Sequence, residues 1–337
     1  MILITGAAGF LGGFLVDEFL KHGFKVRALA RPTSDLSHLK KTTAQIVFAD
    51  ITNTNQVKNV LCGVDEVVHA AAILGGRDKK REDYLKVNYQ ATKNLARCCI
   101  EKKIKRFTFI SSIAAVGPGI NKKTFLDENS QFNPVSFYGE SKRLSEEYLL
   151  SLSNKKKLEV VIIRPALIYG PRDRRCAVNY FRIANLGFFP LPLPADNKTS
   201  FIYVSDAARA IFLAHTQSVA GEIYMLANDV VTVKEFVKKL LLTKGGISLL
   251  IPISPVLINI IASISGFIFR EKGQSSNTID KRIKDIGRGN WAVDNSKIRE
   301  ALNFSPHIDL TEGLRETWRF YSKHKKLLSF RYLVRNF

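Results

Sequence analysis

The chain of 337 residues carries 51 lysines and arginines against 30 acidic residues, a formal net charge of +21. Hydrophobic residues make up 46% of the chain and charged residues 24%, which is typical of a folded protein and excludes disordered and collagen-like classes. The basic residues are spread along the sequence and no DNA- or RNA-binding motif is present, so we expect no nucleic-acid partner.

The four cysteines, Cys62, Cys98, Cys99 and Cys176, lack the spacing of metal ligands, and we expect no metal site. Their pattern is typical of a reduced, cytoplasmic protein. An apolar run that predicts a strand begins at residue 1, so we also expect no cleavable signal peptide.

The first predicted unit is a strand, a glycine-rich turn and a helix. Residues 1–5 are mostly apolar, three glycines follow, and apolar residues then recur at helical spacing through residue 20. This pattern is typical of a dinucleotide-binding unit, whose helix offers free N–H groups to a pyrophosphate. The residues expected to line the cofactor phosphates are Gly6, Ala8, Gly9, Phe10, Leu11 and Gly12.

The second predicted strand, 25–30, ends at Arg31, where a dinucleotide fold distinguishes NADP from NAD. An acid there binds the ribose 2′-hydroxyl, whereas an arginine suits a 2′-phosphate. Thr33 and Ser34 follow as further donors, and the nearest acid, Asp35, comes later. We therefore predict NADP as the cofactor, with NAD as the alternative.

Two more strands are predicted at 45–49 and 66–70. The third strand delivers Asp50 and Ile51 toward the adenine ring. We expect His69, at the end of the fourth strand, to be held by packing and not to be catalytic. Small residues follow it and leave room for the cofactor backbone; they are Ala70, Ala71 and Ala72.

The strongest chemical signal is Tyr138, which lies four residues before Lys142 in a run of helix-forming residues. That spacing puts both side chains on one face of a helix. A neighbouring ammonium and a nicotinamide favour the phenolate, which draws a tyrosine pKa that is ordinarily about 10 toward neutrality. Tyr138 can then take a proton from an alcohol as hydride leaves, or return it to a carbonyl, while Lys142 also binds the nicotinamide ribose.

Ser112 completes the predicted site. It ends the predicted strand 106–112, where its hydroxyl can donate to the substrate oxygen near Tyr138. Ser111 is the competing choice for this role. A surface pair on any amphipathic helix has the spacing of Tyr138 and Lys142, so the prediction also depends on the glycine turn and on Ser112.

These motifs occur in the order of the extended short-chain dehydrogenase/reductases, which the chain resembles from residue 1 to about residue 321. Residues 29–36 look most like the branch with dihydroflavonol reductases and 3β-hydroxysteroid dehydrogenases, commonly described as epimerase/dehydratase-like. The matching segments are Thr5-Gly-x-x-Gly-Phe-x-Gly12, Asp50-Ile51, His69-Ala-Ala-Ala72, Val87-Asn88, Ser111-Ser112, Tyr138-Gly-Glu-Ser-Lys142 and Arg164-Pro-Ala-Leu-Ile-Tyr-Gly-Pro-Arg172.

The resemblance implies a catalytic set of Ser112, Tyr138 and Lys142, with Asn88 supporting the site. It also implies cofactor contacts from Tyr138 and Lys142 and from the residues after a later strand, Pro165 and Ala166. Finally, it implies a homodimer formed through the helices that bear Asn88 and Tyr138.

Alternating strands and helices through about residue 165 predict an α/β fold with a doubly wound parallel Rossmann sheet. We expect an NAD(P)-binding domain at 1–165, to which segments around 201–227 return. A smaller substrate-binding lobe is expected at 166–320 and a basic aromatic tail at 321–337, with the active site in the cleft between the lobes.

Three further elements are predicted in the second half. Ser205 or Asp206 is expected to cap a helix that runs through residue 214. Residues 223–227 are expected to form a late strand, and Thr232 to cap a helix over 233–242.

Two segments suggest contact with a membrane surface. Residues 247–269 carry no charge and are long enough to span a bilayer, but prolines and serines favour an interfacial helix or lid. Residues 321–337 hold five cations, no acid and interleaved aromatics, which suits anionic headgroups, a disordered tail or a dimer contact. We therefore expect a cytoplasmic protein, with peripheral contact to the inner membrane face as a further hypothesis.

Three functions fit these observations. The first is an NAD(P)-dependent reductase or dehydrogenase that acts on a hydroxyl/carbonyl pair of a mostly apolar substrate, with Tyr138 as acid and base. The second is a nucleotide-sugar epimerase with tightly bound NAD. The segment Asn295-Ser-Lys297 resembles the C-terminal pattern of such enzymes. The third is a non-catalytic NADP-sensing regulator, although such proteins usually lack the Tyr138–Lys142 pair.

One mark of nucleotide-sugar binding is missing, because Lys198-Thr-Ser200 replaces the family's diphosphate-binding arginine. The residues that could serve instead are Arg172, Arg174, Arg282 and Arg288. A 4,6-dehydratase is disfavoured because Ser112-Ile-Ala114 stands where those enzymes carry Thr-Asp-Glu.

Overall fold

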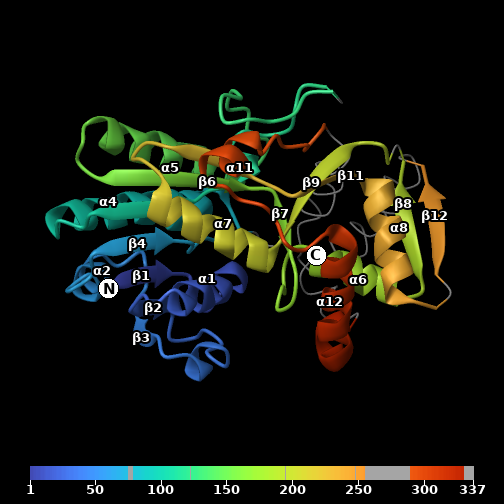
Figure 1. Ribbon diagram of the computed structural model, residues 1–337, viewed down its shortest axis with the longest axis horizontal. Helices are drawn as coiled ribbons and strands as arrows, with labels where there is room; N and C mark the ends of the chain where they lie inside the picture. Colours follow the sequence, from blue (N-terminus) through green and yellow to red (C-terminus); the bar gives the residue numbers. More distant parts are fainter. Residues whose placement is uncertain (75–78, 122, 194, 247, 255–288, 330–337) are drawn as a thin grey trace.

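A seven-stranded sheet forms the centre of the larger lobe (Figure 1). The computed structural model describes residues 1–74, 79–121, 123–193, 195–246, 248–254 and 289–329. The sheet order is β10-β6-β5-β4-β1-β2-β3, and all six pairings are parallel. The strands are β1 (Ile2–Thr5), β2 (Val26–Ala30), β3 (Gln45–Phe48), β4 (Glu66–His69), β5 (Arg106–Ile110), β6 (Glu159–Pro165) and β10 (Ile223–Leu226).

The strand order reverses between β1 and β4, and doubly wound sheets bind their ligands at the carboxyl ends of strands at such a point. The predicted Rossmann sheet is therefore confirmed. The late strand predicted at 223–227 is also present as β10, which pairs with β6 at the edge of the sheet.

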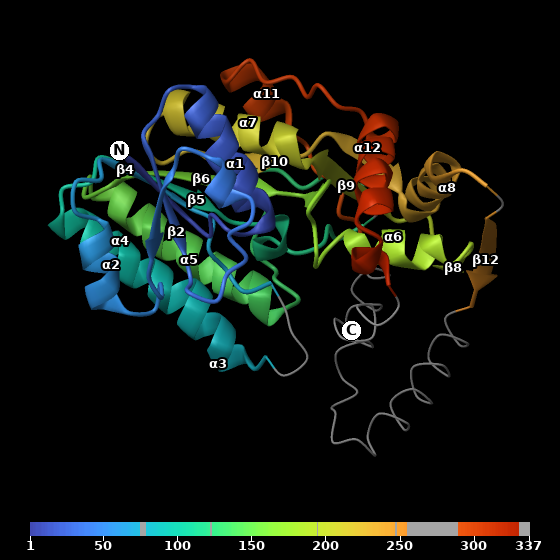
Figure 2. The ribbon, with the colours of Figure 1, turned by 90° about the horizontal axis from the view of Figure 1, so that it is seen from below.

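Helices cover both faces of this sheet (Figures 1 and 2). On one face lie α1 (Phe10–Lys21), α7 (Val204–Gln217) and α11 (Ser296–Ala301). On the other face lie α2 (Thr54–Val60), α4 (Ala91–Glu101) and α5 (Phe137–Asn154). Shorter turns connect them: η1 (Leu39–Lys41), α3 (Arg81–Tyr84), the π-helical η2 (Leu85–Gln90) and η3 (Ile113–Ala115).

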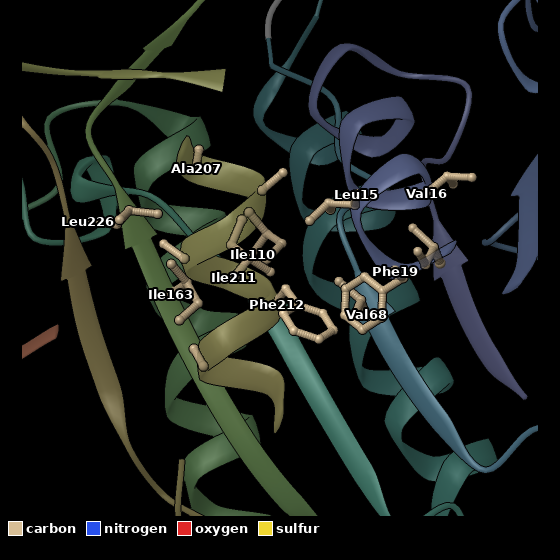
Figure 3. Close-up of a cluster of buried hydrophobic side chains, with 14 of the residues drawn as sticks. Leu15, Val16, Phe19, Val68, Ile110, Ile163, Ala207, Ile211, Phe212 and Leu226 are labelled. Carbon is tan, nitrogen blue, oxygen red and sulfur yellow. The ribbon is translucent and has the colours of Figure 1, made fainter. Parts of the chain in front are cut away.

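Alternate residues of each strand pack on opposite faces. In β1, Ile2 and Ile4 belong to the cluster under α1 and α7, whereas Leu3 belongs to the cluster under α2 and α4. Figure 3 shows the first cluster, in which Phe19 of α1 meets Phe212 of α7 with ring centroids 5.1 Å apart. Because parallel strands are buried on both faces, they need apolar residues at nearly every position.

The helix predicted to start at Ser205 or Asp206 starts earlier. Helix α7 begins at Val204 after Tyr203, and no side chain caps it. The Asp206 carboxylate instead accepts hydrogen bonds from the amides of His307 and Ile308, at 3.0 and 2.9 Å. The cap prediction was therefore wrong, because a contact made about a hundred residues later occupies this carboxylate.

In the described residues, the smaller lobe contains two small sheets and three helices. Strands β7 (Leu167–Tyr169), β9 (Lys198–Tyr203) and β11 (Asp229–Thr232) form one sheet, and β8 (Phe188–Pro192) pairs with β12 (Leu249–Ile253) in the other. The helices are α6 (Val178–Asn185), α8 (Val233–Lys244) and α12 (Leu310–Lys323), followed by the turn η4 (Lys325–Leu328). Thr232 caps α8 as predicted, through the amide of Glu235.

The segment 321–337 does not begin as a tail. Helix α12 runs on to Lys323, and the buried Tyr321 hydroxyl donates to the carbonyl of Asp173 at 2.6 Å. Residues 330–337 lie outside the described residues, as does 255–269 of the apolar segment. Among the residues that the structure does describe, no helix combines the length and the apolar character needed to cross a membrane.

Candidate active site

The glycine turn after β1 has no room for side chains. Gly6 has φ +70°, and a Cβ added to it would lie 2.8 Å from the amide nitrogen of Ala71. A Cβ on Gly12 would lie 2.0 Å from the carbonyl oxygen of Gly6, so α1 rests directly on the turn. The sequence prediction of a tight turn under a closely packed helix agrees with this geometry.

This turn fits the pyrophosphate of a dinucleotide. Gly9 precedes α1 without any side-chain cap, so the N–H groups of the first helical turn are left for a ligand. Ala8, Phe10 and Leu11 belong to this same turn and helix start, and Ala70 and Ala71 pack against Gly6. The cofactor contacts predicted for these residues and for Ala72 stay predictions.

His69 is a structural residue, as expected. Its imidazole is fully buried and is hydrogen-bonded to Thr5 at 2.7 Å and to Thr92 at 2.8 Å. Burial lowers the pKa of His69 to about 3, with a smaller contribution from the Lys142 charge. The neutral ring therefore ties β1, β4 and α4 together beneath the site.

Arg31 and Asp50 lie close together after β2 and β3. The Asp50 carboxylate binds the Thr52 amide and hydroxyl, at 2.8 and 2.7 Å. These bonds lower the pKa of Asp50, and the Arg31 charge adds to the effect. The nearby acid Asp35 does not pair with Arg31. Its carboxylate forms an ion pair with Arg174 at 2.8 Å.

Tyr138 reaches Ser112 because α5 begins against the turn η3. Ser136 caps α5 by accepting from the Gly139 amide at 3.0 Å. A Cβ on Gly139 would lie 2.1 Å from the Ala114 carbonyl oxygen, so only glycine allows this approach. The Ser112 hydroxyl accepts from the Ala114 amide at 3.1 Å and lies near enough to Tyr138 to act on the pKa of that tyrosine.

The ionisation of the pair differs from the sequence expectation. Burial raises the pKa of Tyr138 and the nearby Cys176 adds to this rise, whereas the Ser112 hydroxyl opposes it. Burial also lowers the pKa of Lys142 to about 7. We expected an adjacent ammonium to lower the pKa of Tyr138. Burial has the larger effect, because it disfavours both the tyrosine phenolate and the lysine ammonium.

Lys142 lies directly behind Tyr138. Its side chain is only 2% exposed, and its ammonium donates to the Ile110 carbonyl at 2.6 Å. The same nitrogen lies 4.6 Å from the ring centroid of Phe109 and 5.8 Å from that of Tyr138. Strand β5 thus fixes the lysine at the carboxyl end of the sheet.

Asn88 supports the site without facing it. Its buried amide accepts from the Ile73 amide at 2.8 Å and donates to the Ile73 carbonyl at 3.1 Å and the Ser141 hydroxyl at 3.0 Å. The residue lies in the π-helical turn η2, a feature often found at functional sites. We interpret Asn88 as a positioning residue that joins the end of β4 to α5.

Sequence reasoning missed a buried ion pair beneath Lys142. The Glu146 carboxylate, one helical turn further along α5, accepts from Arg164 at 2.7 and 3.0 Å and also from the Ser111 hydroxyl. Both charged side chains are at most 2% exposed. The four-residue spacing from Lys142 to Glu146 was the available signal. Ser111 thus points into this network, whereas Ser112 meets Tyr138.

Two other predicted groups have clear places. Pro165 ends β6, and the Ala166 amide donates to the Leu226 carbonyl at 2.8 Å, beside the turn that holds Ser112. Arg172 lies over the Phe14 ring at 3.9 Å and pairs with Asp17 at 3.5 Å. Arg282 and Arg288 lie outside the described residues.

Within the described part of the chain, no group of three or more acid, histidine or cysteine side chains could hold a metal ion.

The chain is similar to enzymes of several kinds. It is 28% identical to a UDP-glucose 4-epimerase of Vibrio cholerae, with 94% of both chains covered. It is 25% identical to a Dictyostelium discoideum sterol-4-alpha-carboxylate 3-dehydrogenase (decarboxylating), over 94% of this chain and 99% of the relative. The fold matches a UDP-glucose 4-epimerase from Thermus thermophilus in complex with NAD, with a TM-score of 0.76, 21% identity and coverage of 95% and 98%.

A family model, described as the NAD dependent epimerase/dehydratase family, matches residues 2–227, about two thirds of the chain. That match begins at β1 and ends just after β10, so it covers every strand of the central sheet. The chain therefore belongs to the NAD dependent epimerase/dehydratase family and is an NAD(P)-dependent enzyme of the extended short-chain dehydrogenase/reductase superfamily.

Proposed function

We propose that the protein is a reductase or dehydrogenase that acts at a hydroxyl or carbonyl carbon of a mostly apolar substrate. The observation that carries this proposal is the position of Tyr138, which has the Ser112 hydroxyl near it and the Lys142 ammonium 5.8 Å from its ring centroid. The similarity to a sterol-4-alpha-carboxylate 3-dehydrogenase supports an apolar substrate.

The chain's own residues would place and move the proton. A bound nicotinamide supplies or accepts the hydride at the substrate carbon. Ser112 would donate to the substrate oxygen and keep it within reach of Tyr138. Because burial raises the pKa of Tyr138, its hydroxyl is protonated at neutral pH and is ready to donate to a carbonyl oxygen.

Replacement of Tyr138 by phenylalanine tests the proposal. We expect turnover to fall by about a hundredfold to ten-thousandfold, because only the proton relay is lost. Cofactor affinity should stay nearly unchanged, since the glycine turn is untouched. Steady-state reduction of a carbonyl panel and a fluorescence titration with NADPH measure the two quantities. Retained activity would remove Tyr138 from the catalytic set. Wild-type protein that binds NADPH but turns over no carbonyl or sugar would instead be a cofactor-sensing regulator.

We further propose NADP as the preferred cofactor. Arg31 is exposed just after β2. Its guanidinium makes no hydrogen bond or ion pair with any of the described residues. Asp35, the acid that would favour a free ribose hydroxyl, is paired with Arg174. A 2′-phosphate would give Arg31 a charged partner.

A nucleotide-sugar epimerase is the second candidate, supported by the similarity to the Vibrio cholerae enzyme over nearly the whole chain. Two observations weigh against it. Arg172 and Arg174, which could replace the missing diphosphate ligand, are already paired with Asp17 and Asp35. Asn295, in the resembling C-terminal pattern, donates to the Ala227 carbonyl at 2.5 Å.

Assembly and location follow as proposals of the same kind. We propose a cytoplasmic homodimer formed through α4 and the π-helical turn before it, together with α5, with peripheral contact to the inner membrane face. Light scattering on the purified protein decides the dimer, and a monomer at all concentrations would overturn it.

A further inference from the structure

A cationic cavity opens on the smaller lobe, away from the glycine turn and Tyr138. It has a volume of about 580 Å³ and is lined by the last residues of α6 and α8, by one face of α12 and by η4. Trp318 and Leu328 are its apolar lining residues, and the Trp318 indole N–H donates to the Leu240 carbonyl at 3.0 Å. The cavity therefore has a rigid aromatic wall.

Among the described residues that line this cavity, four are cations and none is an acid; the cations are Lys244, Arg315, Arg319 and Lys325. Lys244 donates to the Ala184 carbonyl at 3.0 Å and so closes the end of α6. The side chains of Arg315, Arg319 and Lys325 have no hydrogen bond or ion pair to any described residue. Glu316 on the same helix is turned inward, where it accepts from Tyr203 at 2.6 Å.

Some arginines elsewhere in the molecule have acid partners. Arg143 pairs with Glu147 at 2.9 Å, and Arg174 pairs with Asp35 at 2.8 Å. Helix α12 does contain carboxylates, but none of the described ones pairs with Arg315, Arg319 or Lys325. A group of unpaired cations around one hollow is a site for an anion.

Large apolar side chains are exposed in the same lobe as the cavity. Leu186 and Leu242 follow or precede the lining residues Asn185 and Thr243 in the sequence, and they are 45% and 79% exposed. Phe188 and Leu249, cross-strand partners in β8 and β12, are 41% and 61% exposed. Figure 1 shows α8, α12 and the β8–β12 pair together in the smaller lobe. We call these four residues the apolar rim.

We propose that this cavity and its apolar rim bind the surface of an anionic lipid bilayer. Phosphate headgroups would take the place of the missing acids, while the rim would enter the boundary between headgroups and acyl chains. A small soluble anion would satisfy the cations but leave four large apolar side chains in water, which is why the membrane is the better fit. The proposal is independent of the reaction at Tyr138.

Vesicle sedimentation with the full-length protein tests the proposal. We expect binding to vesicles of phosphatidylcholine mixed with phosphatidylglycerol and little binding to pure phosphatidylcholine. Combined Arg315→Gln, Arg319→Gln and Lys325→Gln should weaken binding by about a hundredfold, from the usual contribution of a cation near an anionic surface. The matched control, Lys155→Gln with Lys156→Gln and Lys157→Gln, removes the same charge from an exposed turn of the larger lobe and should keep wild-type binding.

A second variant removes apolar surface without any change in charge. Leu242→Ser with Leu249→Ser should also weaken vesicle binding, by about tenfold or more, and thermal unfolding verifies that it is folded. Equal loss in the charge variant and its control would overturn the proposal, because net charge alone would then explain binding. Calorimetric binding of inorganic phosphate without vesicle binding would also overturn it, in favour of a soluble phosphorylated ligand.

Discussion

The fold strongly changes the pKa of Lys142. It is buried behind Tyr138 with one hydrogen bond to the Ile110 carbonyl, and burial lowers its pKa to about 7. Glu146 opposes this shift from the next helical turn. A lysine that gains and loses its proton near neutral pH suits a site that must bind ribose hydroxyls and relay a proton.

This pKa predicts a pH-dependent stability of the cofactor-free protein. Between pH 7 and 10.5 the unfolded lysine holds its proton more tightly than the folded one, so the free energy of unfolding rises with pH across that window. A Lys142→Met variant lacks this contribution. Its stability advantage should be largest below pH 7 and should shrink as the pH rises. Urea denaturation at about pH 6 and about pH 9 measures it, and a constant difference would contradict it.

Arg31 yields the second prediction at this scale. Replacement by aspartate should weaken NADPH binding by about tenfold to a hundredfold, because a charge-assisted contact to the 2′-phosphate is lost. NADH binding should change far less. Lys40→Asp makes the same charge change at a nearby exposed position and serves as the control. Equal losses for both cofactors in fluorescence titrations would show that Arg31 does not read the 2′-phosphate.

Among the elements, α5 carries most of the residues that we propose to be catalytic. Its first turn presents Tyr138 to Ser112, its second holds Lys142, and its third buries Glu146 against Arg164 of β6. Gly139 lets the helix approach η3, and Asn88 ties it to the end of β4. The position of the proposed catalytic pair, Tyr138 and Lys142, therefore depends on contacts along the whole first half of the helix.

The buried ion pair can be tested through stability. Arg164→Met leaves the Glu146 charge without its main partner and should lower the free energy of unfolding by about 3–5 kcal/mol. The double variant with Glu146→Met should recover most of that loss, because two apolar side chains replace both charges. Urea denaturation of the single and double variants measures these free energies of unfolding. Additive losses in the double variant would contradict the prediction.

At the scale of the molecule, the sheet brings the glycine turn after β1 and the Ser112 turn after β5 to the same edge. The chain passes between the two lobes more than once, since β10 joins the central sheet and α7 covers one of its faces, whereas β9 and β11 pair in a separate sheet.

The cofactor content of the purified protein distinguishes the two enzymatic candidates. A reductase exchanges its cofactor in every cycle, so we expect an empty site that binds NADPH more tightly than NADH. An epimerase regenerates its cofactor without releasing it and would retain NAD. Mass spectrometry of the nucleotide released on denaturation measures this directly, and stoichiometric NAD would favour the epimerase.

Local patterns predicted much of this protein. The strand, turn and helix around Gly6 are contiguous, and their glycines are needed for close backbone contacts that the sequence spacing already implies. Tyr138 and Lys142 are one helical turn apart, so helical geometry alone places them together. The same reasoning found the Thr232 cap, whose partner Glu235 is three residues away.

Only the tertiary structure decided the contacts between distant segments. Asp206 was expected to cap a helix but binds the amides of His307 and Ile308, and Glu146 gained a partner on another strand. The raised pKa of Tyr138 likewise comes from burial, which packing creates and sequence spacing does not show. The sequence thus determined the fold class and the chemical groups, because these follow from local periodicity and spacing. Their charge states and supporting partners depend on desolvation and long-range packing, which exist only in the folded chain.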